Sequence, residues 1–422
     1  MDAVTITLCF LGFAVVMFVW EKIPLSVTAM IVAVGLVVTG VLSPKEAFSG
    51  FVDTNVLLFM AMFIVGAAFF ETGMAQAVGS IVTKCAKTER MLIIAVMVIT
   101  GIMSGFLSNT GTAAVLIPVA IGIAQKAGFN QSKFLMPLVL ASAMGGNLSL
   151  IGAPGNMIAQ SALEPMHLAF NFFDYALIGA PVLIVGIIYF VLIGYKLLPA
   201  QPSRKPDDVF NEEKDYSHVA SWRKWLAAIV LVVTILAMIF EKQIGIKLYV
   251  SAWIGALVLI ATRTITETQA VRSIDMKTIL LFVGSLALAA ALVKTGAGAT
   301  IADSILGLLG SHTTPFLLMT VLFIISAILT NFMSNTASTA LLVPIGLSLA
   351  AQMGADPKAV LMAVVIGASC AYATPIGMPA NTMVYNIAGY SFMDYVKVGL
   401  PLMVVSTIVS LILLPIFFPF YP

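Results

Sequence analysis

Four long segments of the chain contain no charged residue and no histidine: 91–125, 134–163, 315–351 and 359–393. Only 9% of the 422 residues are charged, whereas soluble domains contain about 25%. The apolar runs recur along the whole chain and are long enough to cross about 30 Å of hydrocarbon as helices. They are too long for the short alternating strands of an outer-membrane barrel. The sequence therefore predicts an all-α integral membrane protein.

The apolar spans form two sets of five. They lie at about 4–20, 24–42, 54–73, 134–163 and 175–197, then at about 224–240, 247–262, 278–294, 359–388 and 397–418. Between the third and fourth span of each set lies one more apolar region, 91–125 or 315–351, which is short for two crossings and long for one. Each region has polar residues and glycine at its centre, so it predicts a re-entrant hairpin with its tip near mid-membrane, enclosed by protein or a water-filled cavity.

The two sets are related in sequence. The hairpins contain the same tripeptide, Ser108-Asn109-Thr110 in the first and Ser334-Asn335-Thr336 in the second, each followed by a proline at the same spacing. The fourth span of each set, 134–163 or 359–388, is interrupted by a cluster of Gly, Pro and Asn at 152–156 or 377–381. One unit is therefore duplicated. Its Pro and Gly residues should break each fourth span into two half-helices.

The topology follows from the number of crossings. Because a hairpin returns to its own side, each repeat crosses the membrane five times, and the second repeat is inverted relative to the first. Most of the 21 Lys and Arg residues then lie on one face, which the positive-inside rule assigns to the cytoplasm. This places the Pro- and charge-rich linker 199–221 inside and both termini outside a multi-pass protein of the plasma (inner) membrane. Amphipathic segments 74–90 and 297–312 are expected to lie along the interface.

Inverted repeats with interrupted helices are typical of secondary transporters, which bind their cargo where the repeats meet. Two hairpin tips that meet at mid-membrane bring together hydroxyls and amides that donate or accept hydrogen bonds. Helix N-termini at the breaks favour an anion, and unwound carbonyls with Asn, Ser and Thr oxygens suit Na⁺. The sequence therefore predicts a combined anion and cation site.

The charge-free segments also bear on the coupling ion. A proton-driven carrier generally needs a titratable group inside the membrane. None lies in the four segments, so we expect no titratable group near the site and a metal cation rather than H⁺ as the driver.

The same residues allow three other interpretations. Ser, Asn and Thr often join transmembrane helices, but matched copies with matched breaks favour a binding site. An intramembrane enzyme is not expected, because no histidine lies within a span to activate a nucleophile. A channel is disfavoured because closed, inverted hairpin tips suit a carrier.

The paired Ser-Asn-Thr hairpins, the Gly-x-Pro-x-Asn breaks and the five-span repeats resemble the divalent anion/sodium symporters, part of a broader ion-transporter superfamily. The resemblance covers nearly the whole chain and implies a homodimeric elevator. Its scaffold domain would comprise 1–90 and 222–312, with arm helices 74–90 and 297–312. Its transport domain would comprise 91–198 and 313–422 and would slide with the cargo. Such a protein would have lipid, a small di-anion, Na⁺ and a second copy of the chain as partners, and no nucleic acid.

The resemblance also implies site residues. One Na⁺ site would use Ser104, Ser108, Asn109 and Gly152, and a second would use Thr330, Asn335 and Gly377. The anion would contact Ser108, Asn109, Thr110, Ser334, Asn335 and Thr336.

The expected cargo is a C4-dicarboxylate in symport with Na⁺. Many dicarboxylate carriers have a hydroxyl residue just before the proline of each break, where this chain has Ala153 and Met378. Thr374 is expected to compensate in part as a substrate ligand. Because those hydroxyls are missing, sulfate or another oxyanion, a tricarboxylate, and anion exchange remain alternatives.

Overall fold

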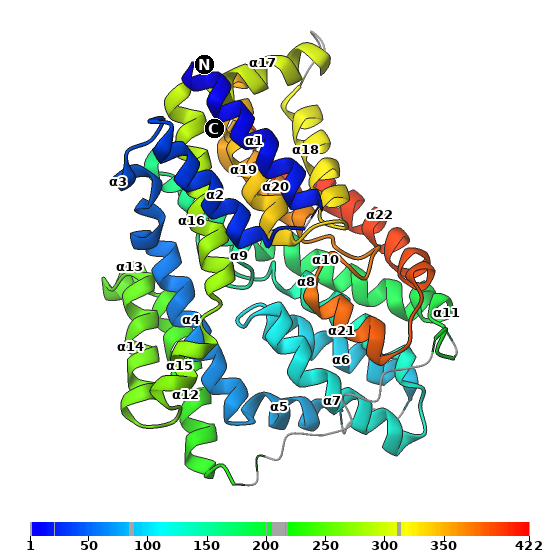
Figure 1. Cartoon of the computed structure of the whole chain (residues 1–422). Coiled ribbons are helices and arrows are strands. Elements are labelled where there is room, and N and C mark those ends of the chain that lie inside the picture. Colours follow the sequence, from blue (N-terminus) through cyan, green and yellow to red (C-terminus); the bar gives the residue numbers. More distant parts are fainter. Residues whose placement is uncertain are drawn as a thin grey trace.

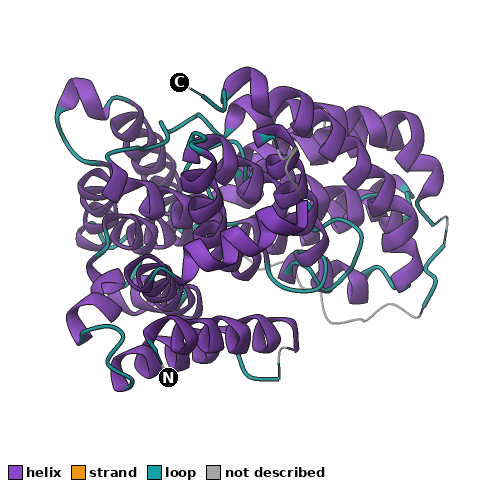
Figure 2. Ribbon diagram, turned by 90° about the horizontal axis from the view of Figure 1, so that it is seen from above, coloured by secondary structure: helices purple, strands orange, loops and turns teal. Residues whose placement is uncertain are grey.

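The computed structural model describes residues 2–20, 22–83, 88–199, 201–204, 216, 218–309 and 314–421. Figures 1 and 2 show that the described part of the chain consists of helices joined by loops. Seven described helices are long and apolar enough to cross a membrane. The predicted all-α class is therefore confirmed.

The first half of the chain contains the predicted order of spans, hairpin and broken span. Its helices are α1 (Ala3–Trp20), α2 (Leu25–Val38), α3 (Pro44–Ala47), η1 (Ser49–Val52), α4 (Thr54–Glu71), α5 (Met74–Thr83), α6 (Glu89–Ser104), α7 (Asn109–Ala127), η2 (Gln131–Lys133), α8 (Leu135–Gly145), α9 (Pro154–Leu163), η3 (Glu164–Met166), α10 (Ala176–Tyr189), η4 (Phe190–Gly194) and α11 (Tyr195–Leu197).

The second half repeats the order. Its helices are α12 (Ser221–Ile239), α13 (Glu241–Ile244), α14 (Leu248–Ala261), α15 (Glu267–Ser273), α16 (Met276–Thr295), α17 (Ala297–Leu309), α18 (Pro315–Leu329), α19 (Asn335–Met353), α20 (Pro357–Ala368), α21 (Pro379–Ile387) and α22 (Phe392–Phe417). Each hairpin is thus a pair of helices, α6–α7 or α18–α19. Each broken span is a pair of half-helices, α8–α9 or α20–α21.

Local sequence sets the ends of both hairpins in the same way. Thr88 and Thr314 cap the first hairpin helices, and each side chain accepts a hydrogen bond from the main-chain N–H three residues later, at 3.2 Å. The second hairpin helices end at Gly128 and Gly354, which have φ of 72° and 60°. Glycine adopts this left-handed conformation without a steric penalty, so it suits a helix C-terminus.

Packing joins the two halves around the hairpins. Helix α9 of the first broken span packs against α19 of the second hairpin, and α21 packs against α7. Helix α2 packs along α16, α14 packs against α4 and α12, and α10 packs against α22. The amphipathic helices α5 and α17 lie at opposite ends of the molecule in Figure 1.

Several predicted boundaries fall partly outside the described residues. These are the linker 199–221, of which 200, 205–215 and 217 are not described, and the arm segments at 84–87 and 310–313. The scaffold and transport assignments of the helices remain predictions.

Candidate functional site

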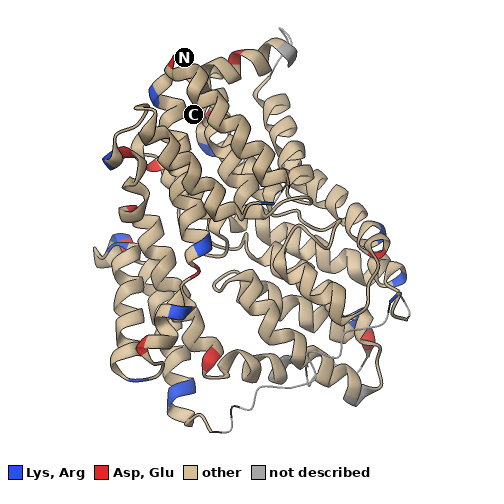
Figure 3. Cartoon of the chain, viewed as in Figure 1, with Lys and Arg blue, Asp and Glu red and all other residues tan. Residues whose placement is uncertain are grey.

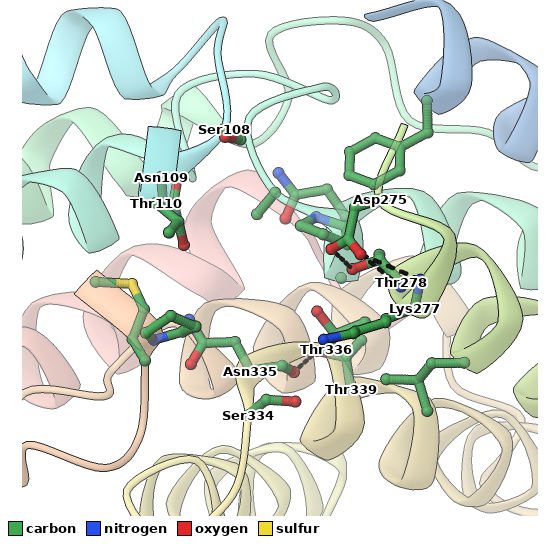
Figure 4. Close-up of a pocket in the computed structure, with 18 of the residues that line it drawn as sticks. Ser108, Asn109, Thr110, Asp275, Lys277, Thr278, Ser334, Asn335, Thr336 and Thr339 are labelled. Carbon is green, nitrogen blue, oxygen red and sulfur yellow. Dashed lines mark hydrogen bonds between the residues drawn. The ribbon is translucent and has the colours of Figure 1, made fainter. Parts of the chain in front are cut away.

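Both Ser-Asn-Thr tripeptides line a single cavity of about 510 Å³. Figure 4 shows Ser108, Asn109 and Thr110 on one side of this cavity and Ser334, Asn335 and Thr336 on another. The breaks contribute Gly152–Asn156 and Gly377–Pro379 to the lining. The volume falls within the range of small-molecule sites, which is about 300–1,000 Å³. The structure thus brings together, in one place, the six tripeptide residues that the sequence singled out.

Each tripeptide forms the start of a helix. Ser108 is the N-cap of α7, and its hydroxyl accepts a hydrogen bond from Gly111 N at 3.0 Å. Ser334 is the N-cap of α19, and its hydroxyl accepts from Ala337 N at 3.2 Å. A hydroxyl that accepts in a cap still has its own O–H to donate. Both tips can therefore offer a hydroxyl donor and the positive end of a helix dipole to an anion.

The breaks place two more helix N-termini at the cavity wall. Helix α9 begins at Pro154 and α21 at Pro379, and both prolines line the cavity. Their N-cap residues, Ala153 and Met378, make no side-chain cap hydrogen bond. The hydroxyl residues that many dicarboxylate carriers have at these two positions would be N-caps of the half-helices, and this chain lacks them. Without a side-chain acceptor in these caps, a bound anion can satisfy the first-turn amides.

An oxygen-rich cluster lies beside the second tip. One end of the Asn335 side-chain amide faces Thr330 Oγ1 at 2.8 Å, Gly377 O at 3.2 Å and Ala368 O at 3.2 Å. With nitrogen at that end, the amide donates a hydrogen bond to an oxygen neighbour, and the cluster is satisfied without a cation. With oxygen at that end, four oxygens converge, which is the donor set that hard cations prefer. The residues predicted for the second Na⁺ site therefore fit such an ion only with the amide oxygen turned to the cluster, whereas the hydrogen-bond geometry favours the nitrogen there.

A corresponding cluster lies beside the first tip. The Ser104 hydroxyl oxygen lies 2.6 Å from Asn109 Oδ1, 2.8 Å from Ser142 O and 3.1 Å from Ser142 Oγ. The Ser142 hydroxyl donates to Asn109 O at 2.7 Å, so the Ser104 hydroxyl has one proton for two remaining acceptors, Asn109 Oδ1 and Ser142 O. This surplus of acceptors suits a cation. Gly152 also lines the cavity, and a methyl group there would overlap the main chain of Gly146. Ser142 was not predicted.

Buried asparagines hold both breaks in shape. Asn156 Nδ2 donates to Gly146 O at 3.0 Å and Ser149 O at 2.7 Å, and Asn381 Nδ2 donates to Ala371 O at 2.8 Å and Thr374 O at 3.1 Å. Both side-chain Oδ1 atoms are buried and have no hydrogen-bond partner within the described structure. Of the two asparagines, Asn156 lines the cavity and Asn381 does not.

Thr374 lies outside the lining of the cavity. Its hydroxyl donates to Asn331 O at the second tip, and the hydroxyl of Ser149 donates to Gly105 O at the first. Both side chains therefore tie a broken helix to a hairpin tip. In this structure the Thr374 hydroxyl supports the tip, and its role as a substrate ligand stays a prediction.

The expectation that no titratable group lies near the site is wrong. Asp275 and Lys277, at the start of α16, line the cavity together with Thr278, and Figure 4 shows them on the side away from Asn109 and Thr110. The charge-free segments gave no sign of this, because α16 lies outside all four. Elsewhere the hairpin helices and half-helices are almost free of charge (Figure 3).

Comparison with known proteins places the chain among membrane transporters. A sequence profile described as "Citrate transporter" (CitMHS) matches residues 15–357 and 336–421. An "Uncharacterized transporter" of Haemophilus influenzae is 29% identical over 95% of this chain and 89% of its own. The "Sodium-dependent dicarboxylate transporter SdcS" of Staphylococcus saprophyticus is 24% identical over 93% of this chain and 82% of its own.

Two solved structures share the fold. The YdaH transporter of Alcanivorax borkumensis has a TM-score of 0.67 at 17% identity and covers 97% of both chains. MtrF of Neisseria gonorrhoeae, one of "a Class of Antimetabolite Efflux Pumps", has a TM-score of 0.65 at 16% identity and covers 100% of this chain and 97% of its own. The citrate transporter profile, which matches nearly the whole chain, confirms the predicted ion-transporter superfamily and a transporter rather than an enzyme. The chain is a multi-pass membrane secondary transporter that belongs to the citrate transporter (CitMHS) family.

Proposed function

We propose that the chain moves a small divalent carboxylate, a C4-dicarboxylate such as succinate, in symport with Na⁺. One observation carries this proposal. In a single cavity, two uncharged tips each combine a helix N-terminus with an adjacent oxygen cluster.

The anion half of the proposal rests on neutral donors. Helices α7, α9, α19 and α21 all begin at the cavity. Their first-turn N–H groups and the hydroxyls of Ser108 and Ser334 suit carboxylate oxygens, as helix N-termini suit anions in general.

The cation half rests on the oxygen clusters around Asn109 and Asn335. A Na⁺ bound in each would offset the negative charge of the cargo. A relative named as a sodium-dependent dicarboxylate transporter supports the same choice of ion and cargo.

The mechanism proposed for this chain is an elevator of two inverted five-span repeats. Residues 91–198 and 313–422 would slide against a dimeric scaffold of 1–90 and 222–312. The placement of α5 and α17 at opposite ends of the molecule supports the inversion. A cysteine introduced at Gln201, in a chain without its native cysteines, should react with a membrane-impermeant maleimide only from the cytoplasmic side. External labelling would contradict the proposed orientation.

A tricarboxylate is the second candidate cargo, and the family description favours it. Sulfate transport and anion exchange would appear as separate outcomes of the same experiment.

The test is uptake by purified protein in proteoliposomes. Labelled succinate, malate, citrate and sulfate are each supplied with an inward Na⁺ gradient or with choline in its place, and with or without internal anion. We expect uptake of succinate or malate that stops when choline replaces Na⁺. A protein that carries both Asn109→Ala and Asn335→Ala should show no uptake. Citrate uptake alone would select the second candidate. Uptake in choline would reject Na⁺ coupling, and uptake that needs internal anion would identify an exchanger.

A further inference from the structure

Lys277 is the only positively charged side chain among the described residues that line the cavity. It lies in the first turn of α16, is exposed, and comes from a helix that packs against α2 and α19. Asp275 is the only acidic side chain among the same lining residues. A charge can bind the cargo only if its side chain is not already occupied by other groups. The partners of Asp275 and Lys277 therefore determine whether the start of α16 attracts an anion.

The Asp275 carboxylate is occupied by its own helix. Its Oδ1 accepts from Lys277 N at 3.1 Å and Thr278 N at 3.4 Å, and its Oδ2 accepts from Thr278 Oγ1 at 2.6 Å. An N-cap carboxylate in this position is offset by the positive end of the helix dipole.

The ammonium group of Lys277 has no such partner. Within the described residues, no carboxylate lies within ion-pair distance of Lys277 Nζ. A primary ammonium offers three donors and needs acceptors. In a cavity whose other donors are neutral, it is the strongest fixed attraction for a second negative charge.

We propose that, in this conformation, Lys277 binds one carboxylate of the cargo while the Ser-Asn-Thr tips bind the other, so that the site selects anions with two separated carboxylates over compact oxyanions. Because Lys277 belongs to the proposed scaffold, this contact would break when the transport segments slide. This inference rests on the proposed transport of a divalent anion and specifies its substrate class. Figure 4 places Lys277 and the first tip on different sides of the cavity, as binding two ends of one molecule requires. Sulfate, whose charge is concentrated in one group, would reach the tips without Lys277.

The experiment measures the KM for succinate and the inhibition constant of sulfate in proteoliposomes at low and high ionic strength. Lys277→Gln removes the charge, and Lys277→Arg keeps it. Arg272→Gln is the matched control, because Arg272 is exposed on α15 and does not line the cavity. A tenfold rise in KM corresponds to about 1.4 kcal/mol.

We expect Lys277→Gln to raise the succinate KM roughly tenfold at low ionic strength and less at high ionic strength, where charges are screened. The inhibition constant of sulfate and the half-saturating Na⁺ concentration should stay within twofold of wild type. Lys277→Arg should stay within about threefold of the wild-type KM, and Arg272→Gln within twofold.

A succinate KM within twofold of wild type in Lys277→Gln would overturn the inference, as would equal impairment of the Gln and Arg variants or an equal weakening of sulfate. If Lys277→Gln shows no uptake, the succinate concentration needed to raise its melting temperature is measured instead, with the same tenfold criterion. Wild-type protein that takes up no carboxylate would overturn the proposed function itself, which separates the two failures.

Discussion

The Asn335→Ala substitution tests the cation cluster directly. The Asn335 side-chain amide faces Thr330 Oγ1, Gly377 O and Ala368 O together, at 2.8 to 3.2 Å. Alanine removes one of four converging groups and leaves the other three in place. A hydrogen bond or ligand contact to a charged group contributes about 1.5–3 kcal/mol. That loss corresponds to a roughly 10- to 150-fold higher half-saturating Na⁺ concentration, enough to abolish uptake at ordinary Na⁺ levels.

The assay is succinate uptake in proteoliposomes across a wide range of Na⁺ concentrations at constant ionic strength. Thr336→Ala is the matched control, because Thr336 is the next residue and lines the cavity without contacting the cluster. It should change the succinate KM and leave the half-saturating Na⁺ concentration unchanged. Melting temperatures of both purified variants check that each protein is folded.

The reasoning would be refuted by an Asn335→Ala protein with a normal half-saturating Na⁺ concentration. It would also be refuted if Thr336→Ala weakened Na⁺ binding and Asn335→Ala weakened only the anion, because the two roles would then be exchanged.

Three further substitutions test the framework around the site. Partial burial raises the pKa of the Glu164 carboxyl, and this effect outweighs the hydrogen bonds from Asn55 and Thr54 that lower it. Because the folded state then prefers the protonated form, the melting temperature of wild type relative to Glu164→Gln should fall as the pH rises from about 4 to 8. Parallel curves for the two proteins would contradict this. Gly399→Ala should give little folded protein by size-exclusion chromatography, because a methyl group there would overlap the Tyr372 carbonyl; normal yield would show that α22 can move away. Tyr395→Phe removes a 2.9 Å hydrogen bond to Asn381 O and should lower stability by about 1 kcal/mol in thermal unfolding followed by tryptophan fluorescence, whereas an unchanged curve would show that the bond contributes nothing.

The sequence predicted the elements of the site well where the signal was local and duplicated. The tripeptides at 108–110 and 334–336 fall at the starts of α7 and α19, and the prolines of the breaks start α9 and α21. These positions were readable because proline and a capping serine determine where a helix begins, whatever it packs against. Their duplication made chance agreement implausible.

Contacts between distant segments could not be read in the same way. Lys277 reaches the cavity because α16 begins beside the hairpins, and no local pattern in 267–278 indicates that position. The supporting hydroxyls of Ser142 and Ser149 lie 38 and 44 residues from their partners Ser104 and Gly105. Ser and Thr are common in membrane helices, so only the folded structure separates these two from the rest. The inverted topology stays a prediction.

Helices α7, α9, α19 and α21 begin at the cavity, and the part of the site they form is built largely from peptide groups. A peptide N–H survives every substitution except proline, so affinity for the cargo should decline gradually under mutagenesis of the tips. The oxygen clusters depend on particular side-chain amides and hydroxyls, which a substitution does remove. Among random substitutions at the tips, more should therefore weaken Na⁺ binding and coupling than should abolish binding of the anion.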